Sequence, residues 1–145
     1  MRKPRTILWL ASLLVFMFVT ACEKEVEDPE ACYTLTIKKE GEVIELADPF
    51  SVDAGRAIQF TNCGHADFYS YFPGTPGHTW SDFTEQDSLE TTGYDTNSTG
   101  DFSITYTDVG TYTATAVLTN RQVGDPFNYK QVAMDFIITV TEAEE

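Results

Sequence analysis

The 145-residue sequence predicts an all-β domain, an antiparallel β-sandwich of seven or eight short strands. Apolar residues recur at every second position in several stretches between residues 32 and 141, which is the period of a half-buried strand. Clusters of glycine, proline and aspartate separate these stretches, as turns do. No stretch of this region carries an apolar face at helical spacing.

Five stretches carry the alternation, and each is rich in the β-branched and aromatic residues that favour strands. Their apolar members are Tyr33, Leu35 and Ile37; Ile58 and Phe60; Phe102, Ile104 and Tyr106; Tyr112, Ala114, Ala116 and Leu118; and Val132, Met134, Phe136, Ile138 and Val140.

Three turn regions separate the strands. Residues 53–55 lead into the strand that contains Ile58. Residues 73–77, Pro-Gly-Thr-Pro-Gly, predict a hairpin with a second strand after it. Residues 85–100 form a polar stretch of about 16 residues, a length typical of a mobile or a functional loop.

The N-terminus has the three-part layout of a secretory signal. Basic residues lie at positions 2, 3 and 5, an apolar run covers residues 7–19, and two small residues precede Cys22. This arrangement resembles the lipobox of bacterial lipoproteins, which implies that residues 1–21 are removed and that Cys22 carries the lipid. An uncleaved anchor is the first alternative, although the run of about 13 residues is shorter than the roughly 20 that span a bilayer. A soluble secreted protein is the second.

Residues 22–31 are predicted to be a solvated acidic tether, because this charged segment with one proline has too little apolar surface to fold. Acidic residues after a lipidated cysteine also resemble the export signal of surface lipoproteins in glycan-foraging Gram-negative bacteria. The resemblance implies a lipid-anchored, surface-exposed position at the outer membrane. The sandwich then covers residues 32–141, and residues 142–145 form an acidic tail.

The charge balance bears on the choice of partners. After removal of residues 1–21 the chain has six basic and 23 acidic residues, a formal charge of −17. Nucleic acids and anionic headgroups require clustered cations, so both are poor candidate partners.

Residues 108–112, Asp-Val-Gly-Thr-Tyr, and the strand after them resemble the tyrosine corner of immunoglobulin-like domains, with Tyr112 as the corner residue. In the order of its segments, the region 32–141 resembles a polycystic-kidney-disease-type (PKD-like) β-sandwich. Residues 66–78 resemble a PKD-like subgroup of surface lipoproteins. The usual Trp-Asp-Phe-Gly-Asp-Gly signature is replaced here by Tyr-Ser-Tyr-Phe-Pro-Gly. Tyr69 and Tyr71 can fill the two inward positions, but no ion-binding role carries over.

Two cysteines remain if Cys22 is lipidated, and outside the cytoplasm such a pair normally oxidises. Cys32 opens the first strand and Cys63 closes the strand of Ile58, so antiparallel pairing brings them together. We expect a structural disulfide; a reactive or metal-binding thiol pair is the alternative.

The sequence contains no recognisable catalytic, phosphate-binding or metal-binding motif. His65 and Asp67 lie beside Cys63 at a spacing that is not typical of metal ligands. A calcium site among residues 85–101 stays open as an alternative. We expect no enzymatic activity, no cofactor and no metal.

Aromatic residues, which form 13% of the chain, are the better functional signal. In the strand predicted after residue 77, His78 and Trp80 share one face, opposite Phe83. Trp80 is then either a core residue or an exposed ring that stacks on a sugar or a protein partner. Phe127 and Tyr129, in the loop before the last strand, are expected to be exposed and to join this candidate site.

The sequence therefore predicts a lipid-anchored binding or accessory module that recognises extracellular glycan. The alternative is a structural subunit that docks onto an outer-membrane protein complex.

Overall fold

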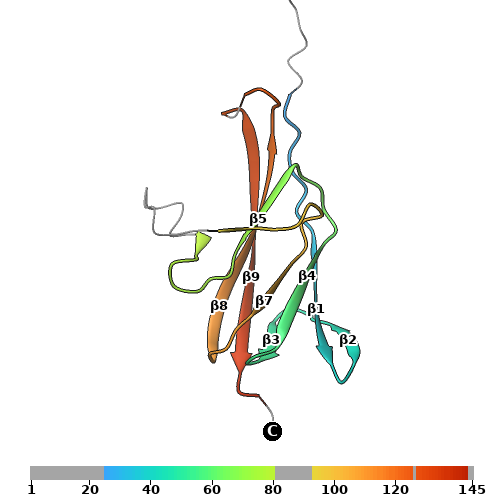
Figure 1. Ribbon diagram of the computed structural model, residues 1–145, viewed down its shortest axis with the longest axis vertical. Coiled ribbons are helices and arrows are strands. Elements are labelled where there is room, and N and C mark those ends of the chain that lie inside the picture. The colour runs from blue at the N-terminus through green and yellow to red at the C-terminus, as the bar shows by residue number, and fades with distance from the viewer. Residues whose placement is uncertain (1–24, 81–92, 126, 144–145) are drawn as a thin grey trace, which may run out of the picture.

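The structure is a computed structural model, and it describes residues 25–80, 93–125 and 127–143 (Figure 1). These residues form two β-sheets and nine strands: β1 (Tyr33–Lys39), β2 (Glu42–Glu45), β3 (Phe50–Asp53), β4 (Ala57–Asn62), β5 (Phe68–Phe72), β6 (Tyr94–Asp95), β7 (Phe102–Thr105), β8 (Gly110–Arg121) and β9 (Tyr129–Thr141). One sheet has the order β2-β1-β4-β7 and the other β3-β9-β8-β5-β6. The predicted β-sandwich is confirmed.

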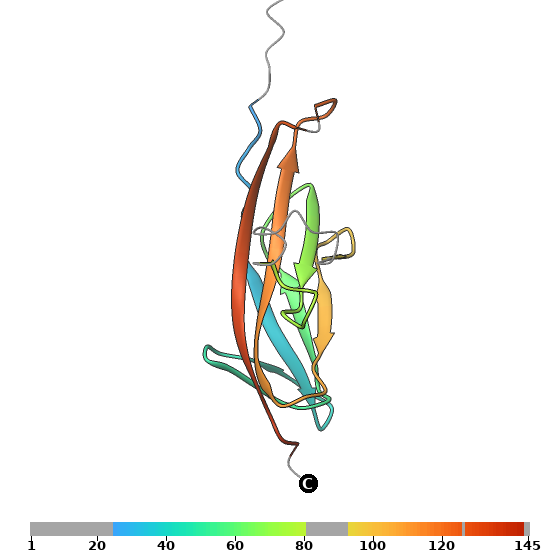
Figure 2. The same ribbon diagram turned by 90° about the vertical axis from the view of Figure 1, so that its left-hand side faces the viewer.

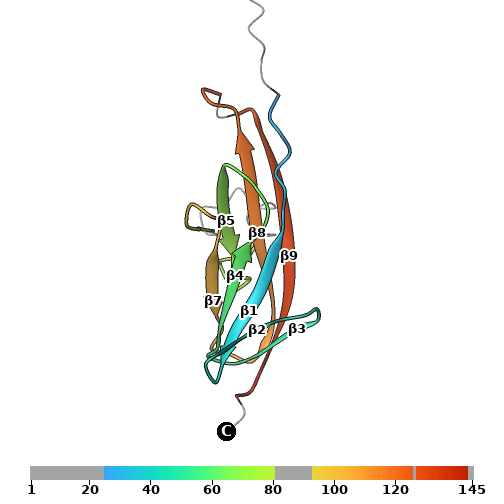
Figure 3. The same cartoon turned by 90° about the vertical axis from the view of Figure 1, so that its right-hand side faces the viewer.

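The β8–β9 hairpin is the longest feature of the fold. Its register runs from Gly110 opposite Val140 to Arg121 opposite Tyr129. Figures 2 and 3 show that this hairpin runs almost the whole length of the molecule and extends beyond the other strands at one end. The chain enters at that end, and its C-terminus lies at the opposite end (Figure 1).

The core lies between the sheets and is formed mainly by the alternating apolar residues of the predicted strands. The fully buried members include Ile58, Phe60, Leu118 and Ile138. Aromatic stacking continues across the core, because the Phe102 ring lies between those of Phe60 and Tyr71, with both centroid distances 4.4 Å. Tyr69 and Tyr71 both pack against this core, as predicted for the two inward positions.

One strand pairing is parallel rather than antiparallel. β3 pairs with β9 from Phe50 opposite Ile138 to Asp53 opposite Thr141. After β2, at the edge of the four-stranded sheet, the chain crosses to the edge of the other sheet. This crossing buries Val52 in the core.

The hairpin predicted at residues 73–77 is wrong, since residues 73–80 contain no strand. His78 instead pairs with Thr75 in an isolated bridge, and Gly74 and Gly77 adopt positive φ angles that allow this tight turn. Phe72 pairs with Thr115, between the core residues Ala114 and Ala116, and so belongs to the outer face of its sheet. Trp80, which follows the turn, packs against Phe72 on this face.

The tether predicted at residues 22–31 is described from residue 25 onward, where most residues are exposed but the segment is docked on the sandwich. Val26 is buried, with 8% of its surface exposed. Glu30 exchanges two backbone hydrogen bonds with His65, both 2.9 Å long. The side-chain amide of Asn120 donates to the Glu27 carbonyl at 3.0 Å. The segment lacks its own core but docks because the sandwich supplies a site for one valine and partners for its backbone.

Candidate functional site

An aromatic cluster, here called the aromatic edge, lies at the last strand of the five-stranded sheet and consists of Tyr71, His78 and Tyr94. Tyr94 on β6 pairs directly with Tyr71 on β5. Their rings stack with centroids 5.4 Å apart. The His78 ring lies 5.0 Å from the Tyr94 ring, and His78 Nε2 is 3.2 Å from the Tyr94 hydroxyl. Tyr94 is 42% exposed, so the cluster combines an accessible ring with polar groups.

Burial, and secondarily the neighbouring Tyr94, raise the pKa of Tyr71 above its ordinary value. Tyr71 therefore stays a neutral phenol at physiological pH. A neutral phenol, an imidazole and an accessible ring together can stack on an apolar ligand face and hydrogen-bond to its hydroxyl groups.

Trp80 is neither a member of the main core nor a fully exposed ring. It is half-buried, and its ring centroid lies 5.1 Å from that of Phe72. Phe72 is 3% exposed on the outer face of its sheet. Trp80 thus packs against the sheet from outside, beside the aromatic edge. Phe83, which is expected on the opposite face of the same strand, lies outside the described residues.

The structure does not bring Phe127 and Tyr129 to Trp80. Tyr129 pairs with Arg121 at the end of β8, whereas Phe72, which contacts Trp80, pairs with Thr115. Arg121 lies six positions after Thr115 in β8, which is roughly 20 Å along the strand. Both residues are exposed as predicted, Phe127 at 89% and Tyr129 at 54%, but they belong to a separate surface.

That second surface, here called the hairpin end, consists of Phe68, Val123, Phe127 and Tyr129. Val123 is fully exposed and Phe68 is 50% exposed. The Arg121 guanidinium lies over the Phe68 ring, 4.7 Å from its centroid. The hairpin end is therefore an apolar and aromatic surface with one cation placed against a ring.

Cys32 and Cys63 form a disulfide with their Cα atoms 4.9 Å apart, as predicted. The bond joins the β1 and β4 ends and leaves Cys63 no thiol for the His65 and Asp67 beside it. Asp67 accepts a hydrogen bond from the Arg121 backbone N–H at 3.0 Å. Within the described ranges, no three histidine, cysteine or acidic side chains converge as metal ligands.

Asp101 lies in the region 85–101, for which a calcium site was the alternative. Its carboxylate is hydrogen-bonded to other groups of the protein. Its carboxylate accepts bonds from the Asn62 backbone N–H at 2.9 Å and the Thr99 hydroxyl at 2.8 Å. These bonds, the Asn62 bond most strongly, lower the Asp101 pKa. The carboxylate thereby fixes the loop before β7 against β4.

Tyr112 makes the contact that defines a tyrosine corner. Its hydroxyl donates to the backbone carbonyl of Asp108, four residues upstream, at 3.0 Å. The Tyr112 ring also stacks on Tyr106, with centroids 4.2 Å apart. Tyr112 thus has a structural role at the turn into β8.

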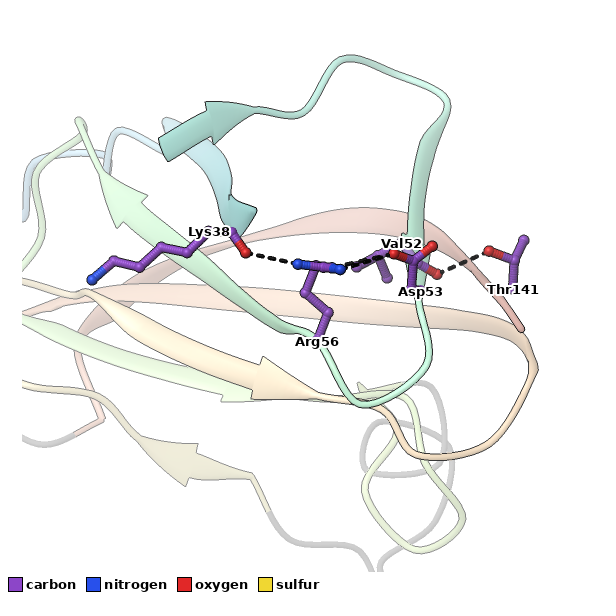
Figure 4. A network of polar contacts seen from close by, with 5 residues as sticks. All are labelled: Lys38, Val52, Asp53, Arg56 and Thr141. Carbon is purple, nitrogen blue, oxygen red and sulfur yellow. Dashed lines mark hydrogen bonds and ion pairs between the residues drawn. The ribbon is translucent and has the colours of Figure 1, made fainter. Parts of the chain in front are cut away.

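A hollow of about 840 Å³ on the four-stranded sheet contains Arg56 in its wall. Figure 4 shows the Arg56 guanidinium between the Lys38 backbone and Asp53. It donates to the Lys38 carbonyl at 2.8 Å and pairs with the Asp53 carboxylate at 3.1 Å. Thr141 donates to the Val52 carbonyl nearby. Because the Arg56 guanidinium is already bonded to Lys38 of β1 and Asp53 of β3, we assign this network a structural role.

Sequence reasoning missed Tyr94, Phe68 and Val123. Tyr94 belongs to a two-residue strand in a polar stretch, so no periodicity indicates it. Phe68 and Val123 are recognisable only from their exposure in the folded chain.

No helix in the described part of the chain is long and apolar enough to cross a membrane. Comparison with known proteins finds no matching family, no matching curated protein and no matching solved structure.

Proposed function

We propose that the protein is a lipid-anchored, non-enzymatic module on the outer-membrane surface that recognises extracellular glycan through the aromatic edge. The observation that carries the recognition is the Tyr94 ring, which is exposed, stacked on Tyr71 and within hydrogen-bond distance of His78. Sugar rings present apolar C–H faces rimmed by hydroxyl groups, which complements an aromatic ring flanked by polar atoms.

The N-terminal sequence supports the anchoring part of the proposal. Cys22 follows a basic start, an apolar run and two small residues. Several acyl chains on one cysteine would hold the chain stably at a membrane. The PKD-like relationship belongs to the same proposal, and the Tyr112 hydrogen bond supports it.

Binding of soluble polysaccharides, screened on a glycan array and measured by calorimetry, tests the recognition. Tyr94→Ala should weaken binding about 2- to 12-fold, because an aromatic contact contributes about 0.5–1.5 kcal/mol. Tyr94→Phe keeps the ring and should retain most of the affinity. Tyr129→Ala removes an exposed tyrosine elsewhere and serves as the matched control. Unchanged binding by Tyr94→Ala would remove the aromatic edge from the site.

A second candidate function is that of a structural subunit of an outer-membrane protein complex. It is favoured by β2, whose four residues are all exposed and which ends the four-stranded sheet. Val43 and Ile44 on this edge are 65% and 40% exposed, and an open edge can pair with another strand. Val43→Lys would then abolish co-purification with a defined membrane protein, whereas Tyr94→Ala would not.

A further inference from the structure

The N-terminal segment and the hairpin end lie at the same end of the molecule (Figures 1 and 3). Lys130, the second residue of β9, forms ion pairs with Glu25 at 3.6 Å and with Asp28 at 3.1 Å. Glu25 and Val123 also line one shallow depression together. The first described residue is therefore fixed beside the tip of the β8–β9 hairpin.

Covalent geometry then limits how far this end can lie from a membrane. Glu25 is three Cα-to-Cα steps from Cys22 along the chain, and an extended chain covers at most about 3.6 Å per step. An acyl group on Cys22 would keep Glu25 within roughly 11 Å of the bilayer interface. An uncleaved apolar run at residues 7–19 would place the same end toward the membrane.

The surface at this end carries four of the nine exposed large hydrophobic side chains of the described residues. Val123 and Phe127 are 100% and 89% exposed, and Tyr129 and Phe68 are about half exposed. Aromatic side chains with a polar atom are typical of membrane interfaces, and Arg121 can extend its charge toward the headgroups.

Three carboxylates near the hairpin end already have partners. Glu25 and Asp28 pair with Lys130, and Asp125 accepts the Phe127 backbone N–H at 3.0 Å. These contacts reduce the cost of placing acidic groups next to headgroups. The acidic chain gives no electrostatic attraction to anionic lipid, so apolar contact has to supply the binding.

We propose that the hairpin end is a second membrane contact, inserted into the interfacial layer of the bilayer beside the acylated Cys22. The proposal rests on the anchoring part of the proposed function. Insertion of the apolar side chains of Val123 and Phe127 then orients the sandwich so that its long axis points away from the membrane. The C-terminal end, at the far end of β9, points outward.

Depth-dependent fluorescence quenching tests this contact. The full chain is produced with its N-terminal signal, purified from membranes and reconstituted into vesicles of phosphatidylethanolamine and phosphatidylcholine. An environment-sensitive fluorophore is attached to Val123→Cys, since Cys32 and Cys63 are bonded to each other. Val43→Cys is the matched control, an exposed valine on β2 toward the other end. Both sites are exposed, so neither change should disturb folding.

We expect lipid-borne nitroxide to quench the probe at Val123 and aqueous iodide to quench the probe at Val43. The blue-shifted emission at Val123 should persist at high salt, because the contact is apolar. Equal quenching of both probes by iodide would overturn the inference while leaving the anchor intact. Protection of Val123 from both quenchers would identify a second copy of the chain as the occupant and also overturn it. Protein that does not float with the vesicles would instead refute the anchoring.

Discussion

The side chain of Asn120 joins the N-terminal segment to the sandwich. Its amide nitrogen donates to the backbone carbonyl of Glu27 at 3.0 Å, and its oxygen accepts the backbone N–H of Asp67 at 2.8 Å. Asn120 is only 8% exposed, so water cannot readily replace either bond. This one side chain therefore connects the segment after Cys22, the start of β5 and the end of β8.

Asn120→Ala should lower the free energy of unfolding by about 1–3 kcal/mol, because it leaves two backbone groups without their partner. Amide hydrogen exchange should rise in residues 25–31, where the segment loses its attachment. Asn128→Ala, at an exposed position of the same hairpin, is the control and should change neither quantity greatly. Unchanged exchange in residues 25–31 of Asn120→Ala would contradict this role.

The docking of residues 25–31 could not be predicted from the sequence, whereas most of the strands could. The alternating stripes of β1, β4, β7, β8 and β9 were predictable, because each strand carries its own period-two signal. Val26 was not, since one valine among charged residues has no periodicity and its site is built by distant strands. The four residues of β2 are all exposed, so this strand has no buried face that would give an alternating pattern.

The candidate site was predicted in part. His78 and Trp80 were identified as aromatic and polar candidates in the sequence, but their expected strand is absent from residues 78–80. His78 lies against Tyr94, which only the pairing of β5 with β6 brings there, whereas Trp80 packs on Phe72. Phe127 and Tyr129 were assigned to the same site because sequence proximity does not show which end of a long hairpin a residue occupies.

The disulfide should account for a measurable part of the stability. Cys32 and Cys63 close a loop of about 32 residues, for which the chain-entropy model gives about 3–4 kcal/mol. The double variant Cys32→Ser and Cys63→Ser should therefore unfold at lower denaturant concentration. The control is the parent protein in reductant, which should approach the same midpoint. Equal midpoints for the oxidised protein and the double variant would contradict the prediction.

Gly74→Ala should be more destabilising than an equivalent change at Gly41. Both glycines have positive φ, +76° and +89°, which strains any L side chain. A Cβ at Gly74 would also overlap the backbone carbonyl of Thr113, whereas a Cβ at Gly41 meets open space. We expect a loss of about 1 kcal/mol for Gly41→Ala and more than about 2 kcal/mol for Gly74→Ala. Similar thermal midpoints for the two variants would refute the overlap.

The protein should lose stability at alkaline pH through the half-buried Tyr33 and the buried Tyr106. Burial, with smaller effects of Tyr69 and Asp101, raises the Tyr33 pKa to about 12. Burial also raises the pKa of Tyr106, whose hydroxyl donates to the Pro73 carbonyl at 2.7 Å. Unfolded phenols ionise near pH 10, so the folded state binds more protons above this pH. Stability should therefore be complete below about pH 10 and fall as the pH rises through about 12.

Denaturant titrations across this range, with phenolate absorbance as the parallel readout, measure the alkaline loss. Tyr33→Phe should show a shallower fall, because one of the contributing phenols is removed. A stability profile of Tyr33→Phe that falls as steeply as that of the parent would exclude Tyr33 as a contributor.

The lipid anchor at Cys22 is the claim on which the proposed location, orientation and second membrane contact depend. Mass spectrometry of the N-terminal peptide from the membrane fraction of a Gram-negative expression host tests it most directly. We predict a peptide that begins at Cys22 and carries the mass of several acyl chains. A chain that retains residues 1–21, or begins at another residue without lipid, would contradict the account.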